Sequence, residues 1–261
     1  MARPEKYSHG QFSWVDLMTS DAGAAKEFYG ALFGWSYVDL PTDQGGVYTQ
    51  FKSRDLPVAG LGEMGDEMKA GGAPAFWNSY VTVDDADAIA ATAEELGGNI
   101  TMPVMQVMTA GRMAFLSDAE GAHFAIWQPA EHAGAGLVNE PVSFCWNELL
   151  TKDVESAKIF YTALFGWEID AAKDAPVEYY GISNEGRING GIIPWSSQMG
   201  DVPPNWGVYF SVSDCDASVE RVEELGGRLL VAPKDIHPGR FAVVADPAGA
   251  VFSVMYLHSP D

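Results

Sequence analysis

The stretch Phe12–Trp35 reads FSWVDLMTSDAGAAKEFYGALFGW, and Phe144–Trp167 reads FCWNELLTKDVESAKIFYTALFGW; 14 of the 24 aligned positions are identical. Two further pairs of segments repeat in the same order: Trp77–Gly98 with Trp206–Gly227, and Gly111–Phe124 with Gly239–Phe252. The chain is therefore one unit of about 130 residues written twice. Two related clefts are expected, and each difference between the copies carries information about function.

The length and composition of the chain suit a globular protein of two domains. Its 261 residues are 47% hydrophobic and 12% aromatic, which is enough for two cores of ordinary size. No apolar run approaches the ~20 residues that cross a membrane, and the first residues lack the apolar core of a signal peptide. We expect a cytoplasmic protein.

The chain is strongly acidic. Lys and Arg total 15 against 36 Asp and Glu, which gives a formal net charge of −21. Such a surface repels phosphate backbones and anionic lipids, so we expect neither nucleic acid nor membrane as a partner. The charge could equally serve solubility alone. Cys145 and Cys215 occupy non-equivalent places in the second copy, so neither a structural disulfide nor a cysteine metal site is expected.

Each copy consists of two similar halves. A strand-like run (Phe12–Leu17) precedes Asp21, whose carboxylate can cap a helix, and Gly34 can end that helix. The apolar residues between them have the spacing of one helical face: Ala25, Phe28, Tyr29, Leu32 and Phe33. The order of one strand, one helix and three strands occurs four times, which predicts an α+β fold of tandem βαβββ modules. We expect domains at residues 7–130 and 140–258, with a linker at 131–139 in a stretch rich in Ala, Gly and Pro.

This layout, with LFGW closing the first helix and Asp-Pro-x-Gly-Ala at Asp246–Ala250, resembles the vicinal oxygen chelate (VOC) superfamily. That superfamily includes glyoxalase I, extradiol dioxygenases and bleomycin resistance proteins, which share the glyoxalase/bleomycin resistance/dihydroxybiphenyl dioxygenase fold. The signature looks particularly like the two-domain, glyoxalase-like proteins of actinobacteria. The resemblance covers nearly the whole chain and implies two VOC domains, but fold alone does not define the chemistry.

The resemblance implies a divalent metal held by His and Glu, yet the positions counted from the family pattern hold other residues. They are Trp14, Asn78 and Ala125 in the first copy, and Trp146, Gly207 and Ser253 in the second. An indole nitrogen carries a proton and offers no lone pair to a metal. Glu63 is the remaining acidic candidate, and one carboxylate cannot hold a catalytic metal tightly. We expect no metal and no other cofactor.

Strand alternation predicts which side chains line each cleft. The first cleft is expected to contain Phe12, Trp14, Asp16, Asn78, Tyr80, His123 and Trp127, and the second Phe144, Trp146, Glu148, Tyr209 and Ser253. Such a lining suits a flat or amphipathic small molecule. Alternatively, Trp14 and Trp146 could fill the clefts and leave no pocket.

Asp16 and Glu148 are the candidate catalytic residues, because an acid beside Trp in a half-dry cleft should have a raised pKa. Alternatively, Arg112 or Arg240 could neutralise them. Both arginines are also candidate ligand-binding residues. His123 could be an acid–base partner or an ordinary surface histidine, and His237 could cover the second cleft. Tyr179 and Tyr180 could belong to a rim or to strand core.

Three functions remain open. The first is a metal-free, bleomycin-resistance-like protein that binds a small aromatic or amphipathic molecule. The second is a metal-independent, glyoxalase-like lyase or isomerase that uses Asp16 or Glu148 as acid and base. The third is a metal-dependent glyoxalase or dioxygenase with displaced ligands. Asp16 is shorter than Glu148, and the clefts differ elsewhere, so we expect two non-equivalent sites in a monomer or homodimer.

Overall fold

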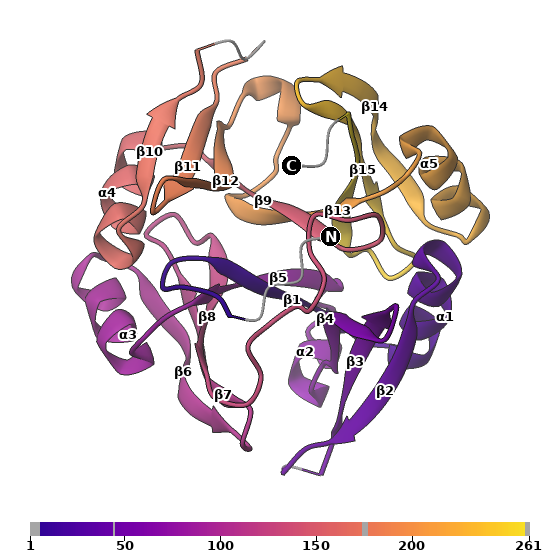
Figure 1. Cartoon of the computed structure of the whole chain (residues 1–261), viewed down its shortest axis with the longest axis horizontal. Coiled ribbons are helices and arrows are strands. Elements are labelled where there is room, and N and C mark those ends of the chain that lie inside the picture. The colour runs from indigo at the N-terminus through magenta and orange to yellow at the C-terminus, as the bar shows by residue number, and fades with distance from the viewer. Residues whose placement is uncertain (1–5, 44, 174–176, 259–261) are drawn as a thin grey trace.

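The computed structural model describes residues 6–43, 45–173 and 177–258. Its first half forms one eight-stranded sheet of two βαβββ modules (Figure 1). The first module contains β1 (Phe12–Thr19), α1 (Ala22–Phe33), β2 (Ser36–Pro41), β3 (Val47–Ser53) and β4 (Leu56–Glu63). The second contains β5 (Phe76–Thr82), α3 (Ala86–Glu95), β6 (Asn99–Val107), β7 (Gly111–Ser117) and β8 (His123–Pro129). A short helix, α2 (Asp66–Ala70), lies between the modules and was not expected from the sequence.

The second half repeats this arrangement in a second eight-stranded sheet. Its first module contains β9 (Phe144–Thr151), α4 (Val154–Phe165), β10 (Glu168–Ala171), β11 (Tyr180–Asn184) and β12 (Arg187–Pro194). A short 3-10 helix, η1 (Ser197–Met199), precedes the last module, which contains β13 (Asn205–Ser211), α5 (Cys215–Glu224), β14 (Arg228–Ile236), β15 (Gly239–Ala245) and β16 (Val251–Leu257). The predicted α+β fold of four βαβββ modules is confirmed.

Each sheet curls into a cup. Within a module the first strand pairs in parallel with the last, as β1 does with β4, and the two modules join through the antiparallel pair β1 and β5. The strand order is β2-β3-β4-β1-β5-β8-β7-β6, and the second sheet has the equivalent order. We call the concave face of the first sheet cup 1 and that of the second cup 2.

The helix ends follow the signals in the sequence. Asp21 and Asp153 accept hydrogen bonds from the backbone N–H groups of Ala24 and Ser156 at 2.9 and 3.0 Å, and so cap α1 and α4. Gly34 ends α1 with φ +68°, in the left-handed region that favours glycine.

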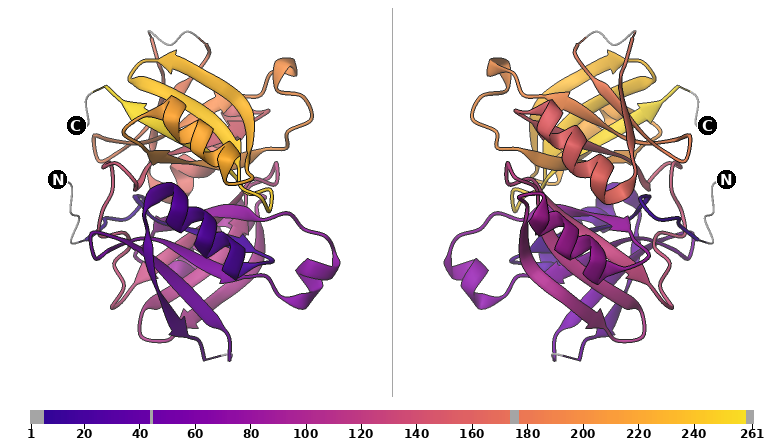
Figure 2. Two further views of the ribbon diagram at one scale, coloured as in Figure 1. Left: turned by 90° about the vertical axis from the view of Figure 1, so that its right-hand side faces the viewer. Right: turned by 90° about the vertical axis from the view of Figure 1, so that its left-hand side faces the viewer.

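The two sheets pack back to back, with helices lying in pairs at their sides: α1 beside α5 and α3 beside α4 (Figure 2). Between them, Tyr29 donates a hydrogen bond to Asp246 at 3.0 Å and accepts one from Trp77 at 3.1 Å. The same contact recurs with Tyr161, Asp118 and Trp206. The two domains therefore share one core, related by an approximate twofold symmetry.

The symmetry of this interface breaks at one residue. Glu120 accepts hydrogen bonds from Thr151 Oγ1 and from the backbone nitrogens of Lys152 and Asp153, at the N-terminus of α4. A carboxylate is stabilised there by the helix dipole. The repeat places Ala248 at the equivalent position beside α1, so only one of the two helices receives this carboxylate.

The face assignment of Phe12 from the sequence is wrong, and the simple alternation that also placed Phe144 in the second cleft is interrupted by an equivalent bulge between Phe144 and Trp146. A bulge between Phe12 and Trp14 shifts the register of β1 against β5. The Phe12 ring therefore turns away from cup 1 and packs against Trp167 and Trp206, at 5.4 and 5.1 Å between centroids. Alternation fails here because a bulge inserts an extra residue into one strand.

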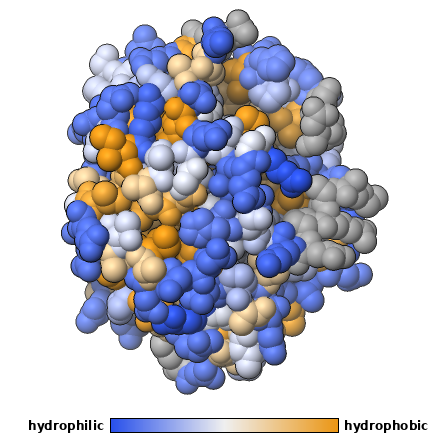
Figure 3. Space-filling model, turned by 60° about the vertical axis from the view of Figure 1, so that its left-hand side comes forward, coloured by the Kyte–Doolittle hydropathy of each residue, from blue (hydrophilic) through white to orange (hydrophobic). Residues whose placement is uncertain are grey.

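The side of the molecule that carries α3 and α4 is mostly hydrophilic, with the largest group of apolar residues on its left half in Figure 3. Within residues 6–43, 45–173 and 177–258, no helix is both long and apolar enough to span a membrane.

Candidate ligand site

Asp16 lies at the centre of cup 1, where neighbouring strands bring three donors to its carboxylate. The Asn78 amide donates to Oδ1 at 2.9 Å, and the hydroxyls of Tyr80 and Tyr48 donate to Oδ2 at 2.8 and 3.2 Å. Asp16 is only 3% exposed. Burial raises its pKa, while the three hydrogen bonds oppose that shift. Cup 1 thus contains a buried, fully partnered acid.

Tyr48 connects this carboxylate to Trp14. The Trp14 indole donates to the Tyr48 hydroxyl at 2.8 Å, and that hydroxyl donates onward to Asp16. Tyr48 lies directly over Gly60: a Cβ at that position would be 1.8 Å from the hydroxyl oxygen. Only glycine can therefore leave room for this tyrosine.

Cup 2 repeats the arrangement around Glu148. Tyr209 donates to Glu148 Oε1 at 2.6 Å, Tyr179 also hydrogen-bonds the carboxylate, and the Trp146 indole donates to Tyr179 at 3.0 Å. A Cβ on Gly191 would be 1.9 Å from the Tyr179 hydroxyl oxygen, as at Gly60. Burial raises the pKa of Glu148, against the two tyrosine hydrogen bonds. Glu148 is half-buried, unlike Asp16.

The sequence identified most of these residues, but it did not assign Tyr48 or Tyr179 to the sites. Trp14, Asp16, Asn78 and Tyr80 meet in cup 1, as expected. Tyr48 was missed, and Tyr179 was left without a role. Both pairs, Tyr48 with Tyr179 and Gly60 with Gly191, are separated by 131 residues in the sequence. Extending the repeat into these divergent strands would have found them.

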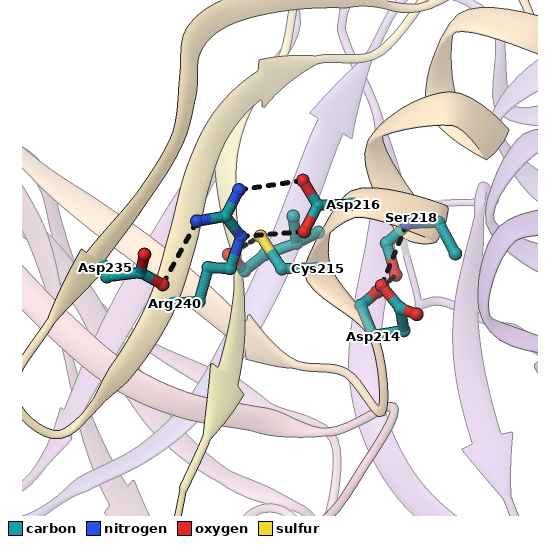
Figure 4. Close-up of polar contacts among 8 residues, drawn as sticks. Asp214, Cys215, Asp216, Ser218, Asp235 and Arg240 are labelled. Atoms are coloured by element: carbon teal, nitrogen blue, oxygen red, sulfur yellow. Dashed lines mark hydrogen bonds and ion pairs between the residues drawn. The ribbon is translucent and has the colours of Figure 1, made fainter.

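The alternative in which Arg112 or Arg240 neutralises the two acids is wrong, because both arginines pair with other carboxylates. Arg112 pairs with Asp87 at 2.6 Å on the side of the sheet that carries α3. Arg240 lies between Asp216 and Asp235, at 2.7 and 3.1 Å, beside α5 (Figure 4). The alternation of β7 explains this, because Arg112 shares a face with Ala114, which is buried on the helix side.

The two candidate histidines lie away from the carboxylates. His123 is exposed at the start of β8, and His237 is exposed in the turn between β14 and β15. The described partners of Asp16 and Glu148 are tyrosines and an asparagine, not these histidines.

A third histidine, in the linker, closes cup 1. The His132 ring meets Trp14 edge to face at 4.7 Å between centroids, and its carbonyl accepts a hydrogen bond from Trp127 at 2.8 Å. Burial lowers the pKa of His132 to about 4. The sequence predicted only a linker here, because its Ala- and Gly-rich composition gives no sign of a tertiary contact.

The rest of the linker is also packed onto the first domain. Ala135 donates from its backbone nitrogen to the Ser13 carbonyl at 2.8 Å, and Gly136 donates to the Pro57 carbonyl at 2.8 Å. The Tyr7 hydroxyl donates to the Ala135 carbonyl at 2.7 Å. Figure 1 shows this segment between β8 and β9, passing over the first sheet. The linker is thus a fixed cover on cup 1.

The residues in the cups do not fit a family-type metal. The Trp14 indole N–H donates to Tyr48 and has no lone pair for a metal, and the Asn78 amide directs its N–H group at Asp16. Glu63 pairs with Lys69 at 2.5 Å. In the part of the chain that the structure describes, no group of three or more His, Cys, Asp or Glu residues could hold a metal ion. What each cup offers is a carboxylate, tyrosine hydroxyls and an indole.

Comparison with protein families defines the class of this protein. The model described as Glyoxalase/Bleomycin resistance protein/Dioxygenase superfamily matches residues 11–126, and a Glyoxalase-like domain matches residues 144–255. The chain belongs to this superfamily, with one such domain in each half.

Similar proteins extend over the whole chain. It is 40% identical over 259 residues to "Putative glyoxylase CFP32" of Mycobacterium tuberculosis, covering 98% of each chain. It is 34% identical to the anthracycline biosynthesis protein DnrV of Streptomyces peucetius, covering 97% of this chain and 95% of that protein.

Solved structures share the fold at lower identity. The Mn(II)-bound glyoxalase from Novosphingobium aromaticivorans has a TM-score of 0.64 at 18% identity, covering 95% of this chain and 82% of that one. The 2,3-dioxygenase LapB from Pseudomonas sp. KL28 has a TM-score of 0.65 at 12% identity, covering 96% and 93%.

Proposed function

We propose that this protein binds a small aromatic or amphipathic molecule without a metal, using a carboxylate as the polar anchor. One observation carries the proposal: the set of tryptophan, tyrosines and carboxylate is built in both cups, around Asp16 and Glu148. An indole and tyrosine rings favour flat apolar groups, and a desolvated carboxylate favours an N–H or O–H donor. The names of the Streptomyces relatives connect them with anthracycline biosynthesis, which supports a small organic ligand.

A second candidate function is metal-independent lyase or isomerase chemistry. The raised pKa of Glu148, caused by burial, favours it, since a carboxyl group that titrates nearer neutrality can both donate and accept a proton. The half-buried position of Glu148 would let a substrate reach it. Under this alternative, Tyr209 and Tyr179 would orient the acid, and Glu148→Gln would abolish turnover while binding persists.

The proposal predicts that protein purified without chelator retains no stoichiometric Zn, Ni, Fe or Mn. The indole, amide and small residues at the family's ligand positions are the reason. Elemental analysis after desalting is the measurement, and native mass spectrometry of the same sample reports any small organic molecule that co-purifies. About one transition metal per domain would overturn the metal-free proposal and restore the third function considered from the sequence.

A further inference from the structure

We propose that cup 2 is the working ligand site, and that its ligand is an aromatic ring bearing a neutral N–H or O–H donor. The inference rests on the proposed function and specifies which cup acts and on what. It comes from a comparison within the molecule: two side chains of the protein itself, His132 and Asn78, fill cup 1, and among the residues that the structure describes no equivalent pair fills cup 2. The ring and the hydrogen-bond donor that occupy cup 1 therefore indicate which chemical groups a ligand of cup 2 would carry.

The first internal occupant is a ring. The His132 imidazole lies edge to face on Trp14 at 4.7 Å and within 5.9 Å of the Trp127 ring. Trp14 is left only 4% exposed. In cup 2, Trp146 is half-buried, and among the described residues it makes no ring contact. Met255 replaces Trp127 in the repeat. Trp146 therefore presents an aromatic surface on which a ligand ring can pack.

The second internal occupant is a donor. Asn78 lies directly opposite Asp16 in the sheet register and donates an amide N–H to it at 2.9 Å. Gly207 lies opposite Glu148 in the same register. A Cβ on Gly207 would meet the Glu148 carbonyl oxygen and the Tyr209 ring at 3.7 and 4.0 Å, which is ordinary van der Waals contact, so a side chain could begin there without a clash. A donor from a ligand would complete the hydrogen bonding of Glu148 as Asn78 completes that of Asp16.

The carboxylate in cup 2 is more exposed than the one in cup 1, as is the indole in cup 2. Asp16 has three side-chain donors and is 3% exposed, whereas the described donors of Glu148 are Tyr209 and Tyr179. A carboxylate in a strongly acidic protein disfavours anionic ligands. The donor that occupies the equivalent place in cup 1 is the neutral amide of Asn78, so we assign to the ligand a neutral donor such as an amide or a phenol. The structure thus assigns both the cup and the chemical class of its ligand.

Benzamide is the matched probe, since it combines the ring of His132 with the amide of Asn78. Titration is followed through the indole N–H resonances of Trp14 and Trp146, assigned with Trp14→Phe and Trp146→Phe. We expect benzamide to shift the Trp146 resonance and leave Trp14 in place. Benzoate, which has the ring without the donor, and cyclohexanecarboxamide, which has the donor without the aromatic ring, should each bind at least about tenfold more weakly.

Two substitutions test the site itself. Gly207→Asn supplies the internal donor that cup 2 lacks. We expect it to weaken benzamide binding at least about tenfold, while the backbone amide NMR spectrum remains that of the folded protein. Glu148→Gln should weaken it similarly. Glu155→Gln removes a charge from the exposed face of α4 and is the matched control, with unchanged affinity.

The outcomes separate this inference from the proposed function. Benzamide binding at Trp14, or unchanged affinity in Gly207→Asn, overturns the assignment of cup 2 while leaving small-molecule binding in place. Equal binding of cyclohexanecarboxamide, or no shift of either indole, overturns the assigned ligand class. A co-purified organic molecule found by native mass spectrometry would keep the proposed function in all these cases, and its absence together with no shift would remove both.

Discussion

Cup 1 and cup 2 repeat one arrangement, but in the part of the chain that the structure describes the side chains around Asp16 are more deeply buried than those around Glu148. In cup 1, Asp16 has three donors and the linker lays His132 on Trp14. In cup 2, Glu148 and Trp146 are half-buried, and Gly207 replaces the amide donor. The comparison teaches that two copies of a duplicated domain can keep the same carboxylate, tyrosine and indole set while differing in how deeply it is buried, and our proposal assigns ligand binding to the less buried copy.

The largest expected difference concerns stability. Asp16→Ala should lower the free energy of unfolding by about 3 kcal/mol, because it leaves three donors in cup 1 without their buried acceptor. Glu148→Ala should cost less, at most about 2 kcal/mol, because two donors rather than three lose their acceptor and one of them, Tyr179, is partly exposed. Urea unfolding of both variants provides the measurement. Equal losses would mean that the two acids have the same role.

The next effect is the dependence on pH that His132 confers. Its buried ring has a pKa of about 4, below the value in the unfolded chain. The stabilisation of the fold by the neutral ring is therefore complete above about pH 6.5 and is lost as the pH falls toward 4. Near pH 5 this amounts to at most about 2 kcal/mol. Burial raises the pKa of Asp16, Glu148, Asp118 and Asp246, and these groups act in the opposite direction.

A matched variant isolates the histidine from those acids. His132→Phe keeps a ring on Trp14 but cannot titrate, so subtracting its unfolding free energy from that of the wild type removes the shared acidic groups. Between pH 7 and pH 5 the wild type should lose unfolding free energy relative to His132→Phe. A difference that does not vary with pH would show that His132 is not held neutral in cup 1.

The smallest expected effect lies at the interface between the domains. Glu120→Ala should cost about 1 kcal/mol, because α4 loses the carboxylate at its N-terminus. The converse change, Ala248→Glu, should stabilise the equivalent end of α1 by up to about 1 kcal/mol. Thermal unfolding measures both. Destabilisation by Ala248→Glu would mean that the two interfaces differ in more than this residue.

The fold was predictable because its signals are local and occur in both copies. Asp21 and Gly34 bound the first helix as expected, and alternation brought Trp14, Asp16 and Asn78 together. Three features were missed because local patterns do not reveal them. The bulge beside Phe12 reverses one face, Tyr48 lies on a strand whose two copies have diverged, and His132 belongs to a linker whose composition resembles a flexible loop.

A crystal structure of the protein with benzamide tests the central claim most directly. We expect the benzamide ring against Trp146 and its amide nitrogen within hydrogen-bond distance of Glu148, with His132 still on Trp14 in cup 1. Benzamide in cup 1 with His132 displaced, or bound away from Glu148, would contradict the claim that the protein fills one cup and binds its ligand in the other.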